Sequence, residues 1–501
     1  MSNFANGGRS RKLASLVRDR NIKQHHNQSE RNIFIRNARK CARIRISTFV
    51  FCISTICTHT FLTNLYYDYH HTPEITSKSW ERYDEQKNLV QKFESSGEAK
   101  ELNDTLTIEK VYEERDQSKG IKPITIAYAV SITSCGKDDI SNLVDGAAVL
   151  KHSIHINSID NHKQNNKESQ FSYQMIAFIH PEAINCQSHM EQLGYIVSIQ
   201  ETPVDVTKIK GDFYREHVVK SGCCGDREFL KLYAYTLMDY PIVVHLDIDC
   251  LILKPLDDLF LVMLKNNVNS DEYKSYGDPN LRNVHVMYEK PIYDTVNAFF
   301  TRDYNMVRPG KKYPGVQGGF LIVRPSIEAF EEYKKIILEG NFKQGTGWGG
   351  LGFGGYYGAQ QIQGIASYFY DHLHPGTAVE LNRCVYNSMA DNPRSSETDG
   401  SKCRDGRELC EDCRGRPMDD IRSIHFTLCQ KPWLCTHFDE NGKYSTTGKM
   451  CNKFHHEWHR VRSDLEAWLE LDNVKSSGNH KAAHFYGHCN HAGKRGYIPL
   501  F

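Results

Sequence analysis

Apolar runs and amphipathic stretches alternate along the chain after residue 120. Three runs have the length and the Ile and Val content of buried strands, at 121–133 (IKPITIAYAVSIT), 171–180 (FSYQMIAFIH) and 241–249 (PIVVHLDID). Between them, residues 144–157 and 227–240 carry apolar side chains at helical spacing. Because alternating strands and helices are typical of a mostly parallel sheet covered by helices on both faces, the pattern predicts an α/β fold.

The carboxyl-terminal part has a less regular pattern. The glycine-rich run at 345–358 (GTGWGGLGFGGYYG) predicts a loop, because so many glycines destabilise a helix. Residues 452–471 predict an amphipathic helix that carries His455, His456 and His459. The histidine spacing is HExH rather than the HExxH of zinc proteases, so we interpret these side chains as part of a solvated helix face.

The amino-terminal 120 residues fall into three segments of different composition. Residues 1–45 carry twelve Lys or Arg against two acidic residues, which is typical of a disordered basic tail. Residues 46–67 contain no Asp, Glu, Lys or Arg, and about 20 such residues can cross a bilayer as a helix. The charged residues 68–120 have the composition of a stem. Since the basic side of a span stays in the cytosol, we expect a single-pass type II protein of the Golgi or ER membrane with a lumenal domain.

We expect this lumenal domain to cover residues 121–471, with a C-terminal tail at 472–501. Thirteen of the sixteen cysteines lie at or after Cys135, and they are densest in the Cys-rich region 385–451. In an oxidising lumen, cysteines at this density predict a disulfide framework. Cys410 and Cys413 form a CxxC pair, but no second pair follows at zinc-finger spacing, so zinc is the weaker alternative.

The charge balance excludes one class of partner. The chain has 62 Lys and Arg against 61 Asp and Glu, for a net charge of +1. This balance supplies no positive field, and no motif of a nucleic-acid-binding fold is present, so we expect no nucleic acid partner.

Two aspartates end the third predicted strand. Asp247 and Asp249 follow the apolar residues 241–246 and should reach the rim of the sheet, where ligands bind in open α/β folds. Two carboxylates there can hold a hard divalent cation, which would bridge the phosphates of a nucleotide-sugar. A DxD pair also occurs by chance as a surface turn, so this motif alone is weak evidence.

The sequence around the aspartates resembles the donor-binding core of the glycogenin-like glycosyltransferases, family 8. The resemblance covers roughly residues 121–435 and rests on three motifs in the family order, at 229–260, 315–326 (GVQGGFLIVRPS) and 425–433 (HFTLCQKPW). It implies a Rossmann-like, GT-A type domain. It also implies a retaining glycosyltransferase that moves a hexosyl or related unit from a UDP-sugar to a glycan or glycoprotein acceptor.

The resemblance implies roles for individual residues. Asp247, Asp249 and His425 would hold Mn²⁺, with Mg²⁺ as the alternative, because carboxylates with an imidazole suit manganese. Lys231 would contact the ribose or phosphate of the donor, and Lys431 would neutralise the diphosphate as a point charge. The remaining donor-side residues are Gln317, Gly318 and Gly319, which would line the sugar pocket, and Trp433 of the KPW motif.

Two positions depart from the family pattern. Leu428 stands where the family has glycine after HFT, and Ile362 stands where the family has an acidic residue near the sugar. The missing carboxylate favours an alternative, a catalytically silent sugar- or nucleotide-binding protein of the same fold. Gln360, Gln361 and Gln363 would still supply hydrogen bonds there, and Asp303 is a spare acidic candidate. For an active enzyme we expect front-face attack with the leaving phosphate oxygen as base, which needs no protein nucleophile.

Overall fold

A computed structural model describes residues 123–136, 140–161, 169–265, 295–307, 313–394, 402–436, 446–469 and 482–501. The predicted basic tail, membrane span and stem at 1–45, 46–67 and 68–120 lie outside these residues. Among the helices that are described, none is both long enough and apolar enough to cross a membrane.

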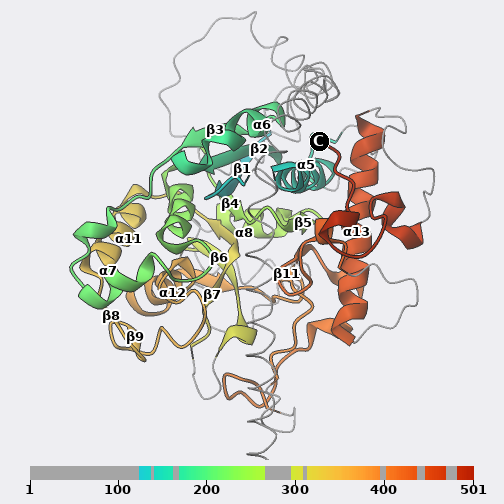
Figure 1. Ribbon diagram of the computed structural model, residues 1–501. Helices are drawn as coiled ribbons and strands as arrows, with labels where there is room; N and C mark the ends of the chain where they lie inside the picture. Colours follow the sequence, from blue (N-terminus) through green and yellow to red (C-terminus); the bar gives the residue numbers. More distant parts are fainter. Residues whose placement is uncertain are drawn as a thin grey trace, which may run out of the picture. The chain divides into compact units, whose positions relative to one another are not determined.

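A seven-stranded sheet carries the fold (Figure 1). Its strands, in spatial order, are β10 (Ala378–Glu380), β6 (Ala298–Arg302), β7 (Val316–Val323), β4 (Val243–Leu246), β1 (Thr125–Ile132), β2 (Ser172–Ile179) and β3 (Ile196–Ile199). Four of its neighbouring pairs are parallel, whereas β7 runs antiparallel to both β4 and β6. The prediction of an α/β fold with a mostly parallel sheet is confirmed, and the two antiparallel pairs make the sheet mixed.

Alternate residues of the strands face opposite layers of helices, as the period of a strand requires. In β1, Ala127 and Ala129 belong to a buried apolar cluster that also includes residues of the helices α7 (Asp212–Val218), α11 (Ile327–Glu339) and α12 (Ile362–Tyr368). On the opposite face, Tyr128 packs edge-on against Phe260 of helix α8 (Asp257–Lys265), with ring centroids 6.4 Å apart. Continuous burial of the strand on both sides explains why its sequence is an unbroken apolar run.

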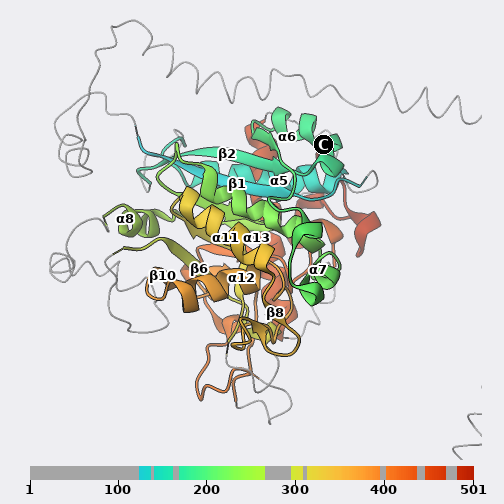
Figure 2. The same ribbon diagram turned by 90° about the vertical axis from the view of Figure 1, so that its left-hand side faces the viewer.

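Helices cover both faces of the sheet (Figures 1 and 2). Their bounds are α5 (Ile140–Ile156), α6 (Gln187–Gln192), α7 (Asp212–Val218), α8 (Asp257–Lys265), α11 (Ile327–Glu339), α12 (Ile362–Tyr368) and α13 (Thr446–Trp468). The sequence sets the ends of α11 directly. Its N-cap Ser326 accepts a hydrogen bond from the backbone N–H of Ala329, and Gly340 ends the helix in the left-handed conformation.

Residues 227–240, expected to form an α-helix, instead lie largely within the 3₁₀ segment Gly225–Thr236. The apolar residues Phe229, Leu230 and Leu232 are buried, as the amphipathic pattern predicts. Nothing in the structure explains the tighter winding. The glycine-rich run 345–358 contains no helix, as predicted, and holds only the two-residue strand β9 (Gly347–Trp348), which pairs with β8 (Phe342–Lys343).

A second, three-stranded sheet lies beside the first. It contains β11 (Tyr386–Ser388), β12 (Ser423–His425) and β5 (Cys250–Ile252), with β12 in the middle. Because β5 follows Asp249 directly and pairs antiparallel with β12, His425 lies opposite Cys250. This pairing brings together two motifs that are far apart in the sequence.

The prediction of a solvated helix face at 452–471 is wrong for two of its three histidines, since only His456 is partly exposed. The side chains of His455 and His459 on α13 are fully buried. The physical reason is that α13 packs against α5 on one side and against the 3₁₀ turns at 482–487 on another. Phe485 from those turns stacks on the His459 ring, with centroids 4.8 Å apart.

Residues 482–501, assigned to a tail from the sequence, are anchored to the domain (Figure 1). The Tyr497 hydroxyl donates a hydrogen bond of 2.6 Å to Oδ2 of Asp145 on α5. The backbone N–H groups of Leu500 and Phe501 donate to the same carboxylate. The carboxylate thereby ties the last residues of the chain to the first helix that the structure describes.

Disulfides crosslink the domain, so the predicted framework is confirmed. The described pairs are Cys135–Cys186, Cys384–Cys413, Cys403–Cys410, Cys429–Cys451 and Cys435–Cys489. The alternative of zinc at Cys410 and Cys413 is wrong, because each of these sulfur atoms is bonded to a different partner.

Candidate active site

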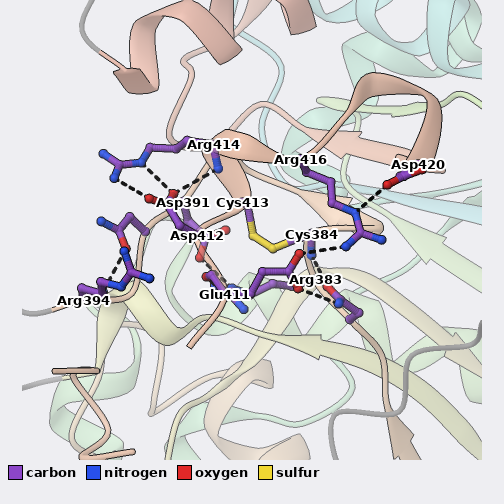
Figure 3. Close-up of a disulfide and its surroundings, with 12 residues drawn as sticks. Arg383, Cys384, Asp391, Arg394, Glu411, Asp412, Cys413, Arg414, Arg416 and Asp420 are labelled. Atoms are coloured by element: carbon purple, nitrogen blue, oxygen red, sulfur yellow. Dashed lines mark hydrogen bonds and ion pairs between the residues drawn. A yellow bond between two sulfur atoms is a disulfide. The ribbon is translucent and has the colours of Figure 1, made fainter. Parts of the chain in front are cut away.

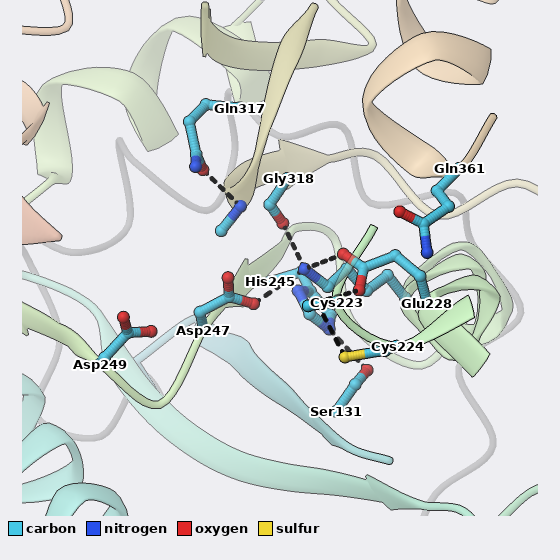
Figure 4. A network of polar contacts seen from close by, with 12 residues as sticks. Ser131, Cys223, Cys224, Glu228, His245, Asp247, Asp249, Gln317, Gly318 and Gln361 are labelled. Carbon is cyan, nitrogen blue, oxygen red and sulfur yellow. Dashed lines mark hydrogen bonds and ion pairs between the residues drawn. The ribbon is translucent and has the colours of Figure 1, made fainter. Parts of the chain in front are cut away.

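Asp247 and Asp249 lie in the short connection between β4 and β5, at the edge of the large sheet. The backbone N–H of Asp247 donates to the carbonyl oxygen of Gly319 on the neighbouring strand β7 (3.1 Å). The backbone N–H of Cys250 donates to the carbonyl oxygen of Asp247 (3.0 Å), which forms a turn. Figure 4 shows both carboxylates near this turn. The end of the strand therefore presents both side chains together.

His425 completes this group from the second sheet. Its Nε2 lies 3.7 Å from Oδ2 of Asp247 and 3.5 Å from Oδ1 of Asp249. The imidazole is 2% exposed, so it faces the two carboxylates rather than solvent. One ligand atom from each of these three residues lies within 4.8 Å of the others. The structure thus brings together the three residues predicted as metal ligands.

Two lysines flank the pair of aspartates, one for each carboxylate. Nζ of Lys231 lies 2.8 Å from Oδ1 of Asp247 and donates to the carbonyl oxygen of Gly318 (2.9 Å). Nζ of Lys431 forms an ion pair with Oδ2 of Asp249. Each carboxylate therefore gives one oxygen to a lysine and directs the other oxygen at His425.

The charges around the aspartates favour their ionised forms. Burial raises the pKa of the Asp247 carboxyl, but Lys231 and His425 together lower it below its ordinary value. Burial likewise opposes the ionisation of Asp249, and His425 and Lys431 hold its pKa far below the usual range. Both side chains are therefore carboxylates at neutral pH, the form that binds cations.

Gly319 and Gly318 let the backbone of β7 approach these side chains. A Cβ atom on Gly319 would lie 2.3 Å from Cε1 of His425 and 2.6 Å from Oδ2 of Asp247. A Cβ on Gly318 would lie 3.0 Å from Cγ2 of Ile362. Gln317 points back to its own strand, where Oε1 accepts a hydrogen bond from the backbone N–H of Gly319 (2.6 Å). Glycine at 319 is thus required by the close approach of two side chains, those of His425 and Asp247.

The residues of this site fit a divalent cation. The donor set is two carboxylate oxygens and one imidazole nitrogen, which suits Mn²⁺ and also accepts Mg²⁺. The oxygens that face His425, Oδ2 of Asp247 and Oδ1 of Asp249, are not the ones paired with the lysines. The flanking positive charges suit a ligand with several negative charges, such as a diphosphate.

The structure places the other predicted residues at different positions around this site. The Gln363 side chain approaches both Gly318 and Gly358, on the same side as Ile362. The backbone carbonyl of Gln360 accepts a hydrogen bond from the Tyr214 hydroxyl (2.7 Å), and its buried Oε1 has no hydrogen-bond partner among the described residues.

Trp433 packs beside the DxD turn. An added Cβ on Gly146 of α5 would touch both the Trp433 indole and the side chain of Ile248. The centroid of the Trp433 ring also lies 5.8 Å from that of the Trp458 ring on α13. The indole therefore lies with the residue between the two aspartates against α5.

Asp303 lies directly after β6, and a buried ion pair lies near it. Burial raises the pKa of the Asp303 carboxyl to about 6, and the charge of Asp391 adds to the effect. Nε of Arg383 donates to Oδ2 of Asp391 (2.7 Å), beside the disulfide Cys384–Cys413 (Figure 3). The crosslinked region thus holds an ion pair whose charges act on Asp303, and the sequence indicated neither of its two residues.

Glu228 is a further residue of the site that the sequence analysis missed. Its Oε1 lies 2.6 Å from Nζ of Lys231, so this lysine joins two carboxylates, Glu228 and Asp247. The available signal was spacing, because residues three apart on a helical turn are neighbours. The pairing also explains why Lys231 is buried rather than solvated, since the two negative charges outweigh burial and raise its pKa.

Comparison with solved structures finds glycosyltransferases. The chain is similar to the bifunctional glycosyltransferase WbbM at 12% identity and a TM-score of 0.34, over 70% of this chain and 52% of that one. It is similar to mouse xyloside xylosyltransferase 1 at 11% identity and a TM-score of 0.32, over 61% and 98% of the two chains. It is also similar to the galactosyltransferase LgtC at 12% identity and a TM-score of 0.31, over 68% and 96%.

This chain therefore spans about half the length of WbbM. Identities and TM-scores this low fix neither a common fold nor an activity. No protein-family model and no curated protein matches the chain.

Proposed function

We propose that this protein is a glycosyltransferase that takes a sugar from a nucleotide-diphosphate donor and depends on a divalent cation. The observation that carries the proposal is the arrangement of two aspartates, one histidine and two lysines at one edge of the sheet. Each aspartate has one oxygen paired with a lysine and one directed at His425. That combination supports binding of a cation and of the anionic phosphates next to it.

Different residues of the site have different roles in binding the donor. Asp247, Asp249 and His425 would hold the cation, which would supply charge neutralisation for the departing diphosphate. The Lys431 side chain is 39% exposed, so it can leave Asp249 and contact a phosphate of the incoming donor. The Lys231 side chain is 7% exposed and bound on two sides, so it fixes the position of Asp247 instead.

Finer properties belong to the same proposal. We propose a UDP-sugar as donor, Mn²⁺ as the preferred cation and a glycan or glycoprotein as acceptor. Ile362 is buried and offers no carboxylate, which supports front-face transfer with retention rather than attack by a protein nucleophile at that position. The disulfides support an oxidising compartment, for which we propose the Golgi or ER lumen, with residues 46–67 as the membrane anchor.

The test measures UDP release by the full-length chain, produced in a secretory pathway so that its disulfides form. The donors are UDP-glucose, UDP-galactose, UDP-N-acetylglucosamine and UDP-xylose, each with Mn²⁺ and with a chelator, in the presence of a glycan mixture. Asp249→Asn should lower the rate by about 10²- to 10³-fold, because it weakens the cation site by several kcal/mol. Asp212→Asn on α7, whose side chain is 82% exposed, is the matched control and should keep the full rate.

The outcomes separate the enzyme from a silent binding protein. Release from one donor that is lost with chelator and in Asp249→Asn, but retained in Asp212→Asn, would support the transferase and identify its sugar. Cation-dependent UDP binding without release from any donor would refute it and favour a sugar- or nucleotide-binding protein. The lack of a carboxylate at Ile362, with Gln363 supplying only hydrogen bonds, would then explain the absence of turnover.

A further inference from the structure

Two adjacent cysteines lie beside the candidate active site without a described disulfide partner (Figure 4). Sγ of Cys223 is 2.8 Å from Sγ of Cys224. Cys223 is exposed and Cys224 is partly exposed, whereas the third free cysteine of the described residues, Cys250, is buried. Five disulfides form elsewhere in the same domain, so an accessible pair of thiols is a notable exception.

The backbone holds this pair in a fixed turn. Gly222 and Gly225, on either side of the two cysteines, both have left-handed conformations, with φ of 60° and 62°. The buried side chain of Gln361 spans the turn, and its Nε2 donates to the carbonyl oxygens of Ser221 and Gly225. A Cβ on Gly222 would lie 1.8 Å from Oε1 of Gln361, so no other residue fits there without a shift. The two sulfur atoms are therefore held together by contacts outside the pair.

The pair also touches the ion pairs of the candidate active site. Sγ of Cys223 lies 3.7 Å from Oε2 of Glu228, to which its single S–H donates whenever it does not donate to Cys224. The other oxygen of Glu228 is 2.6 Å from Nζ of Lys231, and the same nitrogen is 2.8 Å from Asp247. A change of bonding at Cys223 therefore acts on the charges that hold one of the proposed cation ligands.

We propose that Cys223 and Cys224 are a redox-active pair that closes to a vicinal disulfide by exchange with glutathione disulfide, and that closing the ring tightens the cation site at Asp247. The second half of this proposal rests on the proposed function. When the ring forms, the Cys223 S–H donor is lost and Glu228 pairs more strongly with Lys231. Lys231 then competes less for Asp247.

The exchange balances in two steps. The Cys224 thiolate attacks one sulfur of glutathione disulfide, which forms a mixed disulfide and releases one glutathione thiolate that takes up a proton. Cys223 then loses its proton and attacks the Cys224 sulfur, which releases the second glutathione. The pair loses two electrons and two protons, and glutathione disulfide gains them. Cys224 suits the first step because a hydrogen bond from Cys223 lowers the pKa of its thiol to about 7.

Geometry favours the ring over a bound thiophilic cation. Sulfur atoms that share one tetrahedral Zn²⁺ lie about 3.8 Å apart, given Zn–S bonds of about 2.3 Å. The separation of 2.8 Å is much shorter. Adjacent Cα atoms are about 3.8 Å apart, below the usual disulfide range of about 4.4–6.8 Å. A vicinal ring is thus strained and should be more easily reduced than the five long-range bridges.

The test is peptide mapping of the full-length chain after equilibration at several ratios of reduced to oxidised glutathione, with iodoacetamide to trap free thiols. Trypsin cleavage after Lys220 and Arg227 places both cysteines in one peptide, 221–227. At oxidising ratios we expect this peptide to carry no alkyl group and to be lighter by two hydrogen atoms. At reducing ratios we expect it to carry two alkyl groups. The five bridges should stay intact throughout. In Cys223→Ser, which lacks the resolving thiol, Cys224 should retain glutathione.

Three results would overturn the ring. They are two alkyl groups at every ratio, a stable glutathione adduct on the unaltered chain, or protection that disappears on adding a chelator, which would indicate a bound cation. These outcomes do not depend on activity, so they are distinct from a failure of the proposed function.

The coupling is tested by the Mn²⁺ concentration that half-saturates UDP release. We expect it to be about threefold lower in the oxidised form, the size of one weak hydrogen bond. The double variant Cys223→Ser/Cys224→Ser should give one value at every glutathione ratio. A ring without this shift would overturn the coupling to the cation site.

Discussion

Nζ of Lys231 lies 2.8 Å from Oδ1 of Asp247, across a sequence separation of sixteen residues, and both side chains belong to the candidate active site. The lysine is 6% exposed. A buried ammonium is costly unless it is paired, and Asp247 and Glu228 together provide the pairing. The contact therefore couples the stability of the fold to the position of a proposed cation ligand.

Lys231→Met should destabilise the fold as well as the site. It leaves the largely buried Glu228 and the partly exposed Asp247 without their ammonium partner, which costs up to about 3–5 kcal/mol. The measurement is the free energy of unfolding in urea. Glu228→Gln/Lys231→Met should recover part of the loss because one uncompensated charge is removed. Equal stability of the single variant and the unaltered chain would contradict this role for Lys231.

Gly319→Ala should disable the site. The new Cβ would lie 2.3 Å from His425 and 2.6 Å from Asp247, so at least one of these side chains must move. We expect a loss of UDP release of about 10²-fold or more, because small displacements at a site are costly, and a destabilisation of about 1–3 kcal/mol. Direct Mn²⁺ binding, measured by electron paramagnetic resonance, should weaken in parallel. Gly415→Ala is the control, since a Cβ there meets no atom within 4 Å.

The buried His459 should make the domain less stable in mild acid. Burial, and then the neighbouring His488, lower the pKa of His459 well below its ordinary value of 6.5. The unfolded chain therefore binds a proton near pH 6.5 that the folded chain does not bind. The contribution of the neutral His459 side chain to the free energy of unfolding is complete above this pH. It is lost as the pH falls below it, by up to about 1.4 kcal/mol per pH unit.

The measurement compares urea unfolding at about pH 7.5 and about pH 5.5 for the unaltered chain and for His459→Phe. Phenylalanine preserves the stacked contact with Phe485 but cannot bind a proton. The stability of the variant should therefore depend less steeply on pH. It will also be less stable at both pH values, because it loses the contact between His459 Nδ1 and His488 Nδ1 (3.1 Å). An equally steep dependence in the variant would show that other groups cause the acid sensitivity.

The long-range disulfide Cys435–Cys489 should contribute more stability than the local bridge Cys403–Cys410. The first closes a sequence separation of 54 residues and the second a separation of 7. Chain-entropy arguments give about 4 kcal/mol for the longer loop and about 2.5 kcal/mol for the shorter one. Replacing both cysteines of each pair by serine and comparing the two Tm values checks this order. A larger loss from the Cys403–Cys410 pair would show that native contacts outweigh loop closure.

The regular elements were largely predictable because local pattern determines them. The apolar runs at 121–133, 171–180 and 241–249 contain β1, β2 and β4, and residues 144–157 lie almost wholly within α5. Strand and helix periods are properties of neighbouring residues, so they can be seen in the sequence without tertiary contacts. The antiparallel course of β7 was not visible, since direction follows from how a connection returns to the sheet.

The candidate site was predictable as a set of residues, because Asp247, Asp249 and His425 occur in short recognisable motifs. Burial of the α13 histidines was not predictable, because it depends on residues 482–487 folding back over that helix. The pairing of Glu228 with Lys231 had only a spacing signal.

The sequence by itself determined the α/β pattern, the chemistry of the DxD and HFT motifs, and the presence of a disulfide framework. The tertiary structure decided which cysteines pair, which oxygen of each aspartate faces His425, and which lysine is buried. The physical reason is the distance along the chain over which each effect acts. Periodicity and residue chemistry act over a few positions, whereas charge pairing and burial depend on segments that lie far apart in the chain, such as Lys431 and Asp249 with a separation of 182 residues.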